Sequence, residues 1–577
     1  MFGIATNVRS CSTTMRYYEI AIYYYTPQRL PHLILILISK STGIPYHGPS
    51  KIRRGRDGLR KRRRIDFTKL NDPGCMHSGN HGGHHQHLQL GMAGTNGIRD
   101  VDFWTMICQR KKNRVNFFKC CSSGQNDVGV GGGSCSCLLD LPVGEEFNAA
   151  FVSRSGFDRP ILFTNKTPSQ LGLRVPLSED IAFDNDCSSF GYANVASLVG
   201  PYRIVQVIDT ATQLTTECTL QEWVEYLETP PQERIRTLNI ITLEFSQTPL
   251  GKLVTEPQFA RDVDFVNLHW PQSVGDVGSA PTMDEDGENG IEETSSTTLS
   301  QSAEELDDDL LETLNKEQPR VSKYCLMSAA GSFTDFHIDF GGTSVWYHVY
   351  FGSKVFYFIE PTSANLKVYS DWATNSSGKN GNSRYVFLPD LIVSAGGEVY
   401  EVTLQKGQTL FIASGWIHAV YTPEDSLVFG GNFLHRHSLE MQLTIYKLER
   451  KMKVGADFRY PRYQTLLWFV ARDFLMECTK LTQQKKQEWL NENVLVDVAS
   501  DQHEAHVICQ SYSPRILRGY RALATELARW SISKTKQSID QFPQNMSVAA
   551  VSDDLGRITK LCIAYLDSNE RVTVSTR

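Results

Sequence analysis

The sequence lacks several features that define common classes of protein. None of its thirteen cysteines stands in a C-x-x-C pair, which argues against a complete zinc finger and against the disulfide framework of a secreted domain. No apolar run approaches the ~20 residues needed to cross a bilayer. The run Leu33–Ile38 begins too late, behind too many polar residues, for a signal peptide. We therefore expect a globular protein with disordered parts and no membrane association.

Charge is unevenly distributed along the chain, although the net charge is only −6. The segment His47–Arg64 is densely basic, and such clusters serve as nuclear addresses or contact DNA phosphates, here through residues 51–64. A solvated linker is the alternative interpretation. From Asp284 to Glu317 thirteen acidic residues accompany a single lysine, a composition typical of disorder. This acidic stretch is interpreted as a tolerated surface insertion or as a competitor for basic peptides.

One stretch, Thr334–Lys354, carries the clearest chemical signal. His337 and Asp339 are two residues apart, so on a β-strand their side chains point to the same face. His418 follows 81 positions after His337 (418 − 337) in another β-rich run. Two imidazoles and one carboxylate on one face of an octahedral Fe(II) leave three positions open for other ligands. The pattern therefore predicts an iron site, with a solvated strand edge as the alternative for His-x-Asp alone.

Lys354 is the second unusual residue of this stretch. It follows Gly352 and Ser353, which we interpret as a tight turn between two strands rich in aromatic and β-branched residues. A lysine in an apolar barrel is unfavourable unless it meets an anion. The position of Lys354 thus indicates a dicarboxylate partner.

The rest of the globular pattern predicts a mainly β fold with helices. Short strands separated by Gly, Pro and Asp turns follow one another from Glu398 to Asn432, a rhythm typical of a double-stranded β-helix, the jelly roll of cupin type. After His435 the apolar residues recur at helical spacing, for example in 441–452, 463–475 and 521–530. We expect a barrel followed by a C-terminal helical region.

Five segments of the sequence resemble JmjC-domain histone lysine demethylases, specifically the subgroup in which a PHD finger precedes the JmjC domain. The segments that carry this resemblance are Asn239–Ser246, Tyr324–Ser328, Thr334–Val349, Lys406–Val420 and Phe429–His435. They span about 160–480 with two interruptions. The tetrapeptide H-G-P-S at His47 resembles the end of that finger, yet no ladder of zinc ligands precedes it, so we expect the finger to be missing.

The resemblance implies a cofactor and a reaction. His337, Asp339 and His418 would bind Fe(II), and no further catalytic side chain is expected beyond the metal centre. The co-substrate 2-oxoglutarate would place its distal carboxylate on Lys354 and Thr334, with Tyr347 and Asn239 as further contacts. With O2, the enzyme would oxidise the N-methyl group of mono- or dimethyl-lysine on tails of histone H3, and in some cases H4, releasing formaldehyde.

The domain organisation expected from these features has five parts. They are a largely disordered region at 1–150 with the basic segment 47–64, the N-terminal part of the catalytic region at 151–270, an acidic disordered insert at 271–320, a JmjC barrel core at 321–450 and a helical region at 451–577. A histone substrate on nucleosomes places the protein in the nucleus, where it would act on chromatin and transcription.

Two other functions fit the same sequence. A JmjC barrel can hydroxylate a protein, in which case the product is a stable alcohol without formaldehyde. The chain could also be a chromatin-binding scaffold with an idle iron site, although the presence of every ligand argues against this. Three further histidines, His269, His348 and His435, lack ligand spacing and are interpreted as structural.

Overall fold

A computed structural model describes most of the chain beyond its N-terminal region. The described residues are 106–111, 118–120, 137–139, 141, 146–181, 189–210, 215–240, 243–271, 308–376, 386–491, 501–532 and 547–575. The basic segment 47–64 lies outside them, as do most of the regions 1–150 and 271–320 that the sequence predicts to be disordered.

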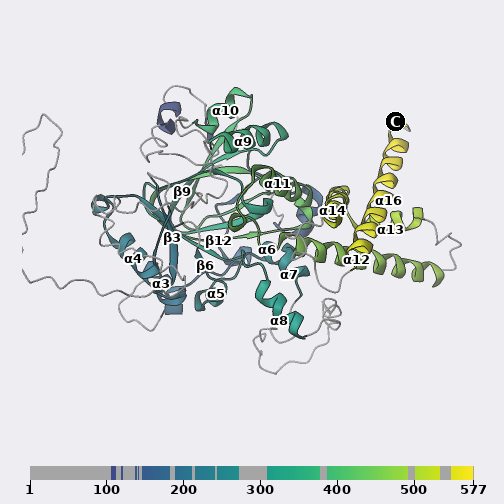
Figure 1. The fold of residues 1–577 in the computed structure, drawn as a ribbon, viewed down its shortest axis with the longest axis horizontal. Coiled ribbons are helices and arrows are strands. Elements are labelled where there is room, and N and C mark those ends of the chain that lie inside the picture. The colour runs from purple at the N-terminus through teal and green to yellow at the C-terminus, as the bar shows by residue number, and fades with distance from the viewer. Residues whose placement is uncertain are drawn as a thin grey trace, which may run out of the picture. The chain divides into compact units, whose positions relative to one another are not determined.

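The strands of the described residues form one mixed sheet of twelve strands, with the jelly-roll character that the sequence predicts (Figure 1). Its main path runs in the order β1, β10, β9, β12, β7, β5, β3 and β4, while β11, β2, β6 and β8 pair beside this path. The pair β1–β10 is parallel and the others are antiparallel. The strands are β1 Phe118–Cys120, β2 Ile161–Phe163, β3 Ile204–Asp209, β4 Thr215–Thr219, β5 Leu238–Ile240, β6 Leu243–Glu244, β7 Tyr324–Ser328, β8 Phe333–His337, β9 Ser344–Ile359, β10 Val399–Gln405, β11 Thr409–Ile412 and β12 Ile417–Phe433.

The two longest strands, β9 and β12, correct one expectation from the sequence. Gly352 and Ser353 do not form a turn between two strands, because β9 runs through them without a break and pairs with β12 over nearly its whole length. Gly352 has φ +79°, and a Cβ on it would lie 2.4 Å from the Asp425 carbonyl oxygen. The glycine therefore permits close approach of β12 at an irregularity in the pairing register rather than a chain reversal.

The helices flank the sheet and fill the C-terminal part of the chain. The helices are α2 Ala149–Ser155, α3 Tyr192–Val199, α4 Leu220–Glu228, α5 Pro249–Leu253, α6 Gln258–Val263, α7 Phe265–His269, α8 Asp308–Glu317, α9 Ser363–Ser376, α10 Leu388–Ser394, α11 Leu439–Met452, α12 Tyr463–Asn491, α13 Asp501–Ser511, α14 Pro514–Ile532 and α16 Val548–Ser575. The helical periods predicted after His435 correspond to α11, α12 and α14, so the predicted C-terminal helical region is confirmed.

Apolar side chains of α12, α13, α14 and α16 share one core, in which Trp468, Leu523 and Leu555 are fully buried. The sheet has a separate core built around aromatic side chains such as Trp346 and Phe429. Helix α11 lies between these parts, because its Leu443 belongs to the helical core while its Ile445 packs with α9 and α10. The barrel and the helical region are thus joined through α11.

Part of the predicted acidic insert is helical. Helix α8 occupies residues 308–317, and the Trp270 indole Nε1 donates a hydrogen bond of 3.0 Å to the carbonyl oxygen of Leu314. Trp270 closes the segment before the insert, and Leu314 is buried against it. The two ends of the 272–307 segment are therefore held near one another on the folded domain.

Candidate metal centre

Two neighbouring strands bring the predicted ligands together. His337, the last residue of β8, is directly opposite His418 of β12, and the two imidazole centroids are 4.3 Å apart. Asp339 lies just beyond β8, at the start of the 3-10 turn η6, Phe340–Gly342. Asp339 is therefore not on the strand, contrary to the prediction from side-chain alternation. Its carboxylate nevertheless lies close to the two imidazoles. One ligand atom from each of the three residues lies within 4.8 Å of the others.

Backbone carbonyl groups orient both imidazole rings. The Nδ1 atom of His337 lies 2.8 Å from the Asp335 carbonyl oxygen, and Nδ1 of His418 lies 3.1 Å from that of Trp416. Because a carbonyl oxygen only accepts, each Nδ1 carries the proton and each Nε2 presents a lone pair to the centre. Burial, reinforced by His337, lowers the pKa of His418 to about 4. Its imidazole is therefore neutral at pH 7, as metal binding requires.

This donor set fits a divalent iron. Two imidazoles and a carboxylate on adjacent elements form the facial arrangement of non-haem Fe(II) sites. The His418 Nε2 atom lies 3.8 Å from an Asp339 carboxylate oxygen, close enough for both to bind one ion. Among the described residues no other group of three such side chains converges in this way.

A cavity of about 140 Å3 opens from the three residues into the barrel. All seven side chains predicted from the sequence line it. They are Asn239, Thr334, His337, Asp339, Tyr347, Lys354 and His418. Much of the remaining wall is apolar, with Val345, Phe356 and Ile412 among its residues. The structure thus brings the predicted residues together, while their individual roles stay predictions.

Lys354 is the most unusual group in the cavity. It is 2% exposed, and its Nζ donates a 2.8 Å hydrogen bond to the hydroxyl oxygen of Thr422. No carboxylate of a described residue lies within ion-pair distance. Burial lowers the pKa of Lys354 to about 7. A buried ammonium with one neutral partner among the described residues would be stabilised by an external anion.

Thr422 is a contact that the sequence reasoning missed. Side-chain alternation along β12 could have revealed it, because Thr422 is two and four residues from Val420 and His418, and all three line the cavity. Thr334, which the resemblance placed beside the co-substrate, lies across from Val420 in the β8–β12 pair. The two threonines therefore reach the cavity from adjacent strands.

Asn239 and the remaining histidines also have defined surroundings. The side-chain oxygen Oδ1 of Asn239 is buried and has no hydrogen-bond partner among the residues that the structure describes, so it is available to a ligand in the cavity. His348 Nδ1 lies 2.9 Å from the Thr409 hydroxyl, and His435 Nε2 lies 3.0 Å from the Ser344 hydroxyl. Both histidines lie outside the ligand cluster, which fits the structural interpretation.

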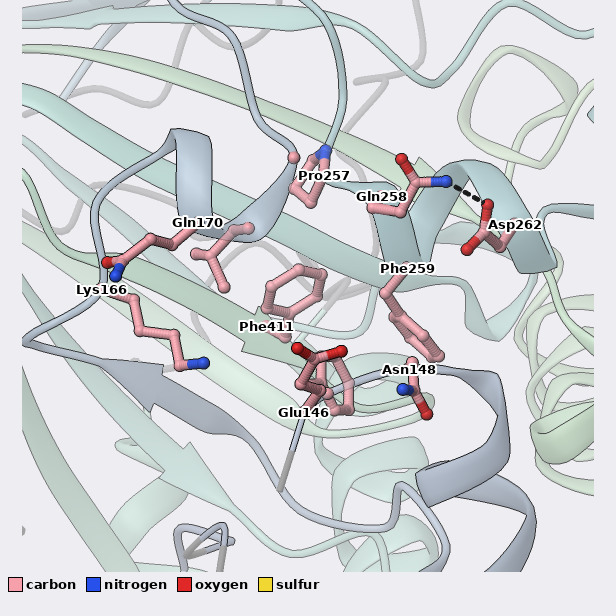
Figure 2. Close-up of a pocket in the computed structure, with 12 residues that line it drawn as sticks. Glu146, Asn148, Lys166, Gln170, Pro257, Gln258, Phe259, Asp262 and Phe411 are labelled. Carbon is pink, nitrogen blue, oxygen red and sulfur yellow. Dashed lines mark hydrogen bonds between the residues drawn. The ribbon is translucent and has the colours of Figure 1, made fainter. Parts of the chain in front are cut away.

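A second cavity of about 240 Å3 lies on the other side of β11 (Figure 2). Adjacent residues of that strand face the two cavities, since Ile412 lines the metal cavity and Phe411 the second one. Gln258 and Asp262 on its wall are joined by a 2.6 Å hydrogen bond. None of the residues predicted from the sequence lines this cavity, so the metal centre is the candidate site.

Comparison with protein families decides the classification. A family described as "JmjC domain, hydroxylase" matches residues 324–433, the strands that carry all three candidate ligands. This chain contains a JmjC domain. A second family, "Jumonji helical domain", matches residues 437–561, which include α11 to α14 and part of α16. The predicted JmjC barrel with a helical C-terminal region is therefore confirmed.

Curated relatives of this JmjC-domain protein are named as demethylases. It is 39% identical over 351 residues to "Lysine-specific demethylase 2A" of Xenopus tropicalis, covering 60% of this chain and 26% of the relative. Identity to "Histone lysine demethylase PHF8" of Danio rerio is 35% over 338 residues, 59% of this chain and 27% of the relative. "Lysine-specific demethylase 7B" of Danio rerio is 30% identical over 409 residues, 71% of this chain and 56% of the relative. The chain thus spans about a quarter to a half of their length.

Proposed function

We propose that this chain is an Fe(II)- and 2-oxoglutarate-dependent dioxygenase that removes methyl groups from mono- and dimethyl-lysine of histone tails. The observation that carries the proposal is the convergence of His337, Asp339 and His418 at one end of a cavity that also holds the buried Lys354. This enzyme class needs a ligand set for iron and a cationic group for the distal carboxylate of 2-oxoglutarate. One apolar cavity holds a candidate for each.

Each group in the cavity has a proposed role. His337, Asp339 and His418 hold the iron through two Nε2 atoms and a carboxylate oxygen. Lys354 binds the distal carboxylate of 2-oxoglutarate, while the hydroxyls of Thr422 and Thr334 orient that pair. Iron with its co-substrate and O2 supplies oxidation of an N-methyl group, whose hydroxymethyl amine product then releases formaldehyde.

The other lining residues would bind and shield the reactants. The unpartnered Oδ1 of Asn239 accepts a hydrogen bond from a bound molecule, and Tyr347 contacts the co-substrate as the resemblance implies. The Tyr347 ring packs edge to face against Phe356 with their centroids 5.2 Å apart. Together with Val345 and Ile412 these rings exclude water from the reacting centre.

The substrate class is inferred from the relatives. Two of them are named lysine-specific demethylases and one a histone lysine demethylase, which supports a histone tail as the partner and the nucleus as the location. Contact of residues 51–64 with nucleosomal DNA is part of the proposal and concerns a segment outside the described residues. Among the described residues, no helix combines the length and the hydropathy that a membrane crossing requires.

Mass spectrometry of methylated H3 and H4 tail peptides tests this function. The chain is incubated with Fe(II), ascorbate and 2-oxoglutarate, and His337→Ala serves as the control. Losses of about 14 mass units per methyl group with the wild type alone are expected. A gain of about 16 mass units without formaldehyde would show that the chain is a hydroxylase and not a demethylase. No mass change on any peptide or nucleosome would favour a catalytically idle, chromatin-binding scaffold.

The binding of 2-oxoglutarate should weaken as the pH rises above 7. The pKa of Lys354 in the folded, ligand-free protein is lowered to about 7, so its ammonium, and the attraction for a carboxylate, is present below that pH and lost above it. The dissociation constant is expected to rise about tenfold per pH unit there. Titration of the Mn(II)-loaded protein with 2-oxoglutarate measures it. A flat profile for the wild type, or a slope that persists in Lys354→Met, would contradict the assignment.

A further inference from the structure

The turn that carries Asp339 is held by the helical domain. The backbone N–H of Gly341, two residues after Asp339, donates a 2.7 Å hydrogen bond to the Oε1 atom of Glu449 in α11. The Ser414 hydroxyl, between β11 and β12, donates a 2.5 Å hydrogen bond to the carbonyl oxygen of Gly342. The turn is thus held by two hydrogen bonds, one of them from outside the barrel.

Steric contact reinforces these hydrogen bonds. Gly341 and Gly342 have φ values of +63° and +67°, which favour glycine. A Cβ on Gly341 would lie 3.0 Å from the Cβ of Tyr460, and one on Gly342 would lie 2.9 Å from the Cα of Gln442 in α11. The turn therefore lies directly against the backbone of the helical domain, and small shifts of α11 would move Asp339.

Glu449 is unusual for a residue with a merely structural role. The residue is 5% exposed, and its second carboxylate oxygen, Oε2, has no hydrogen-bond partner among the described residues. Burial raises the pKa of Glu449 to about 8, with the hydrogen bond from the Gly341 N–H and then Arg459 opposing the shift, so the carboxyl group is mostly neutral at pH 7. Burying a carboxyl group costs free energy unless hydrogen bonds compensate for the lost water. Among the described residues, the hydrogen bond that the Glu449 carboxyl group makes is to the turn that carries Asp339.

We propose that Glu449 is a positioning residue of the metal centre. By accepting the Gly341 N–H it holds the turn so that the Asp339 carboxylate faces the two imidazoles, and the Jumonji helical domain thereby contributes to metal affinity without providing a ligand. The inference rests on the proposed iron site. It extends that site into a domain whose sequence contains no metal ligand of the centre.

Metal affinity of paired variants tests the proposal. Glu449→Met keeps the volume but removes the acceptor, whereas Glu449→Gln keeps both. Glu526→Met is the matched control, because Glu526 is also buried, at 4% exposed, and pairs with Lys447 and Arg529 rather than with a residue of the turn. Co(II) is titrated into each full-length protein and followed by its visible absorption, and thermal melting of the metal-free proteins is recorded in parallel.

We expect Glu449→Met to weaken Co(II) binding roughly 10- to 100-fold, as loss of outer contacts to metal ligands usually does, while Glu449→Gln stays within about threefold of the wild type. Glu526→Met should melt earlier but bind Co(II) normally. If Glu449→Met does not fold, Glu449→Asp, which retracts the acceptor, is compared with Glu449→Gln in its place.

Three results would overturn the inference, in two distinguishable ways. Normal Co(II) binding by Glu449→Met, or an equal loss in Glu526→Met, would leave the metal site in place but remove the positioning role of Glu449. Failure of the wild type to bind Co(II) at all would refute the proposed metal centre, and the positioning role with it.

Discussion

Replacing Asp339 with alanine is expected to lower formaldehyde release from a dimethyl-lysine H3 peptide by more than ~100-fold, since even outer contacts to metal ligands are worth about 10- to 100-fold. Asp339 supplies the only anionic donor of the three ligands, so its loss leaves two neutral imidazoles to hold a dication. The same change should abolish saturable Fe(II) binding, measured by equilibrium dialysis under anaerobic conditions.

Asp335→Asn is the matched control for this experiment. Asp335 is buried on the same strand two residues before His337, its carboxylate accepts a 2.7 Å hydrogen bond from the Phe336 N–H, and it is not among the residues that line the cavity. The backbone carbonyl that orients His337 is unchanged by the substitution. Activity within about threefold of the wild type is expected. An Asp339→Ala protein that still turned over would place the metal elsewhere.

Exchange of Lys354 for methionine is expected to raise the KM for 2-oxoglutarate at least ~30-fold, because loss of one partner of a buried charge pair costs about 2 kcal/mol or more. The metal-free and ligand-free protein should instead gain stability, on the order of 1–2 kcal/mol, since methionine is apolar and a buried ammonium without an anion is unfavourable. Steady-state kinetics and denaturant unfolding of the same preparation measure both effects.

A second lysine separates the loss of this contact from a general effect of removing a charge. Lys323 is also partly buried, but its Nζ donates to the carbonyl oxygens of Gly251 and Val254 outside the cavity. Lys323→Met should lower stability and leave the KM for 2-oxoglutarate unchanged. If Lys354→Met lost stability and kept its KM, the ammonium would be part of the fold and not of a co-substrate site.

Much of the metal centre could be predicted from the sequence because its parts are local. His337 and Asp339 are two residues apart, Lys354 interrupts an apolar strand, and His418 lies in a strand with recognisable β periodicity. Residue type and spacing therefore sufficed to predict these side chains as site residues. The long segments around them that resemble a known family supported the same prediction. The helical region was equally accessible, since α11, α12 and α14 have regular apolar spacing.

The parts that could not be predicted depend on contacts between distant segments. Gly352 has the local signature of a turn, and only the approach of the Asp425 carbonyl oxygen explains why β9 continues through it. Thr422 acquires its partner from β9, and Glu449 meets Gly341 over 108 residues of chain. The alternation of β12 places Thr422 on the cavity face, but no periodicity within one segment identifies its partner or that of Glu449.

The hydrogen bond between Trp270 and Leu314 allows the segment between these residues to vary in length. Because the two residues meet on the folded domain, the segment between them can lengthen or shorten while both attachment points stay in place. Doubling its length adds only about 0.6 kcal/mol of closure entropy. Evolution can therefore vary residues 272–307 nearly independently of the barrel, and a reporter protein or affinity tag spliced in there should leave the fold intact.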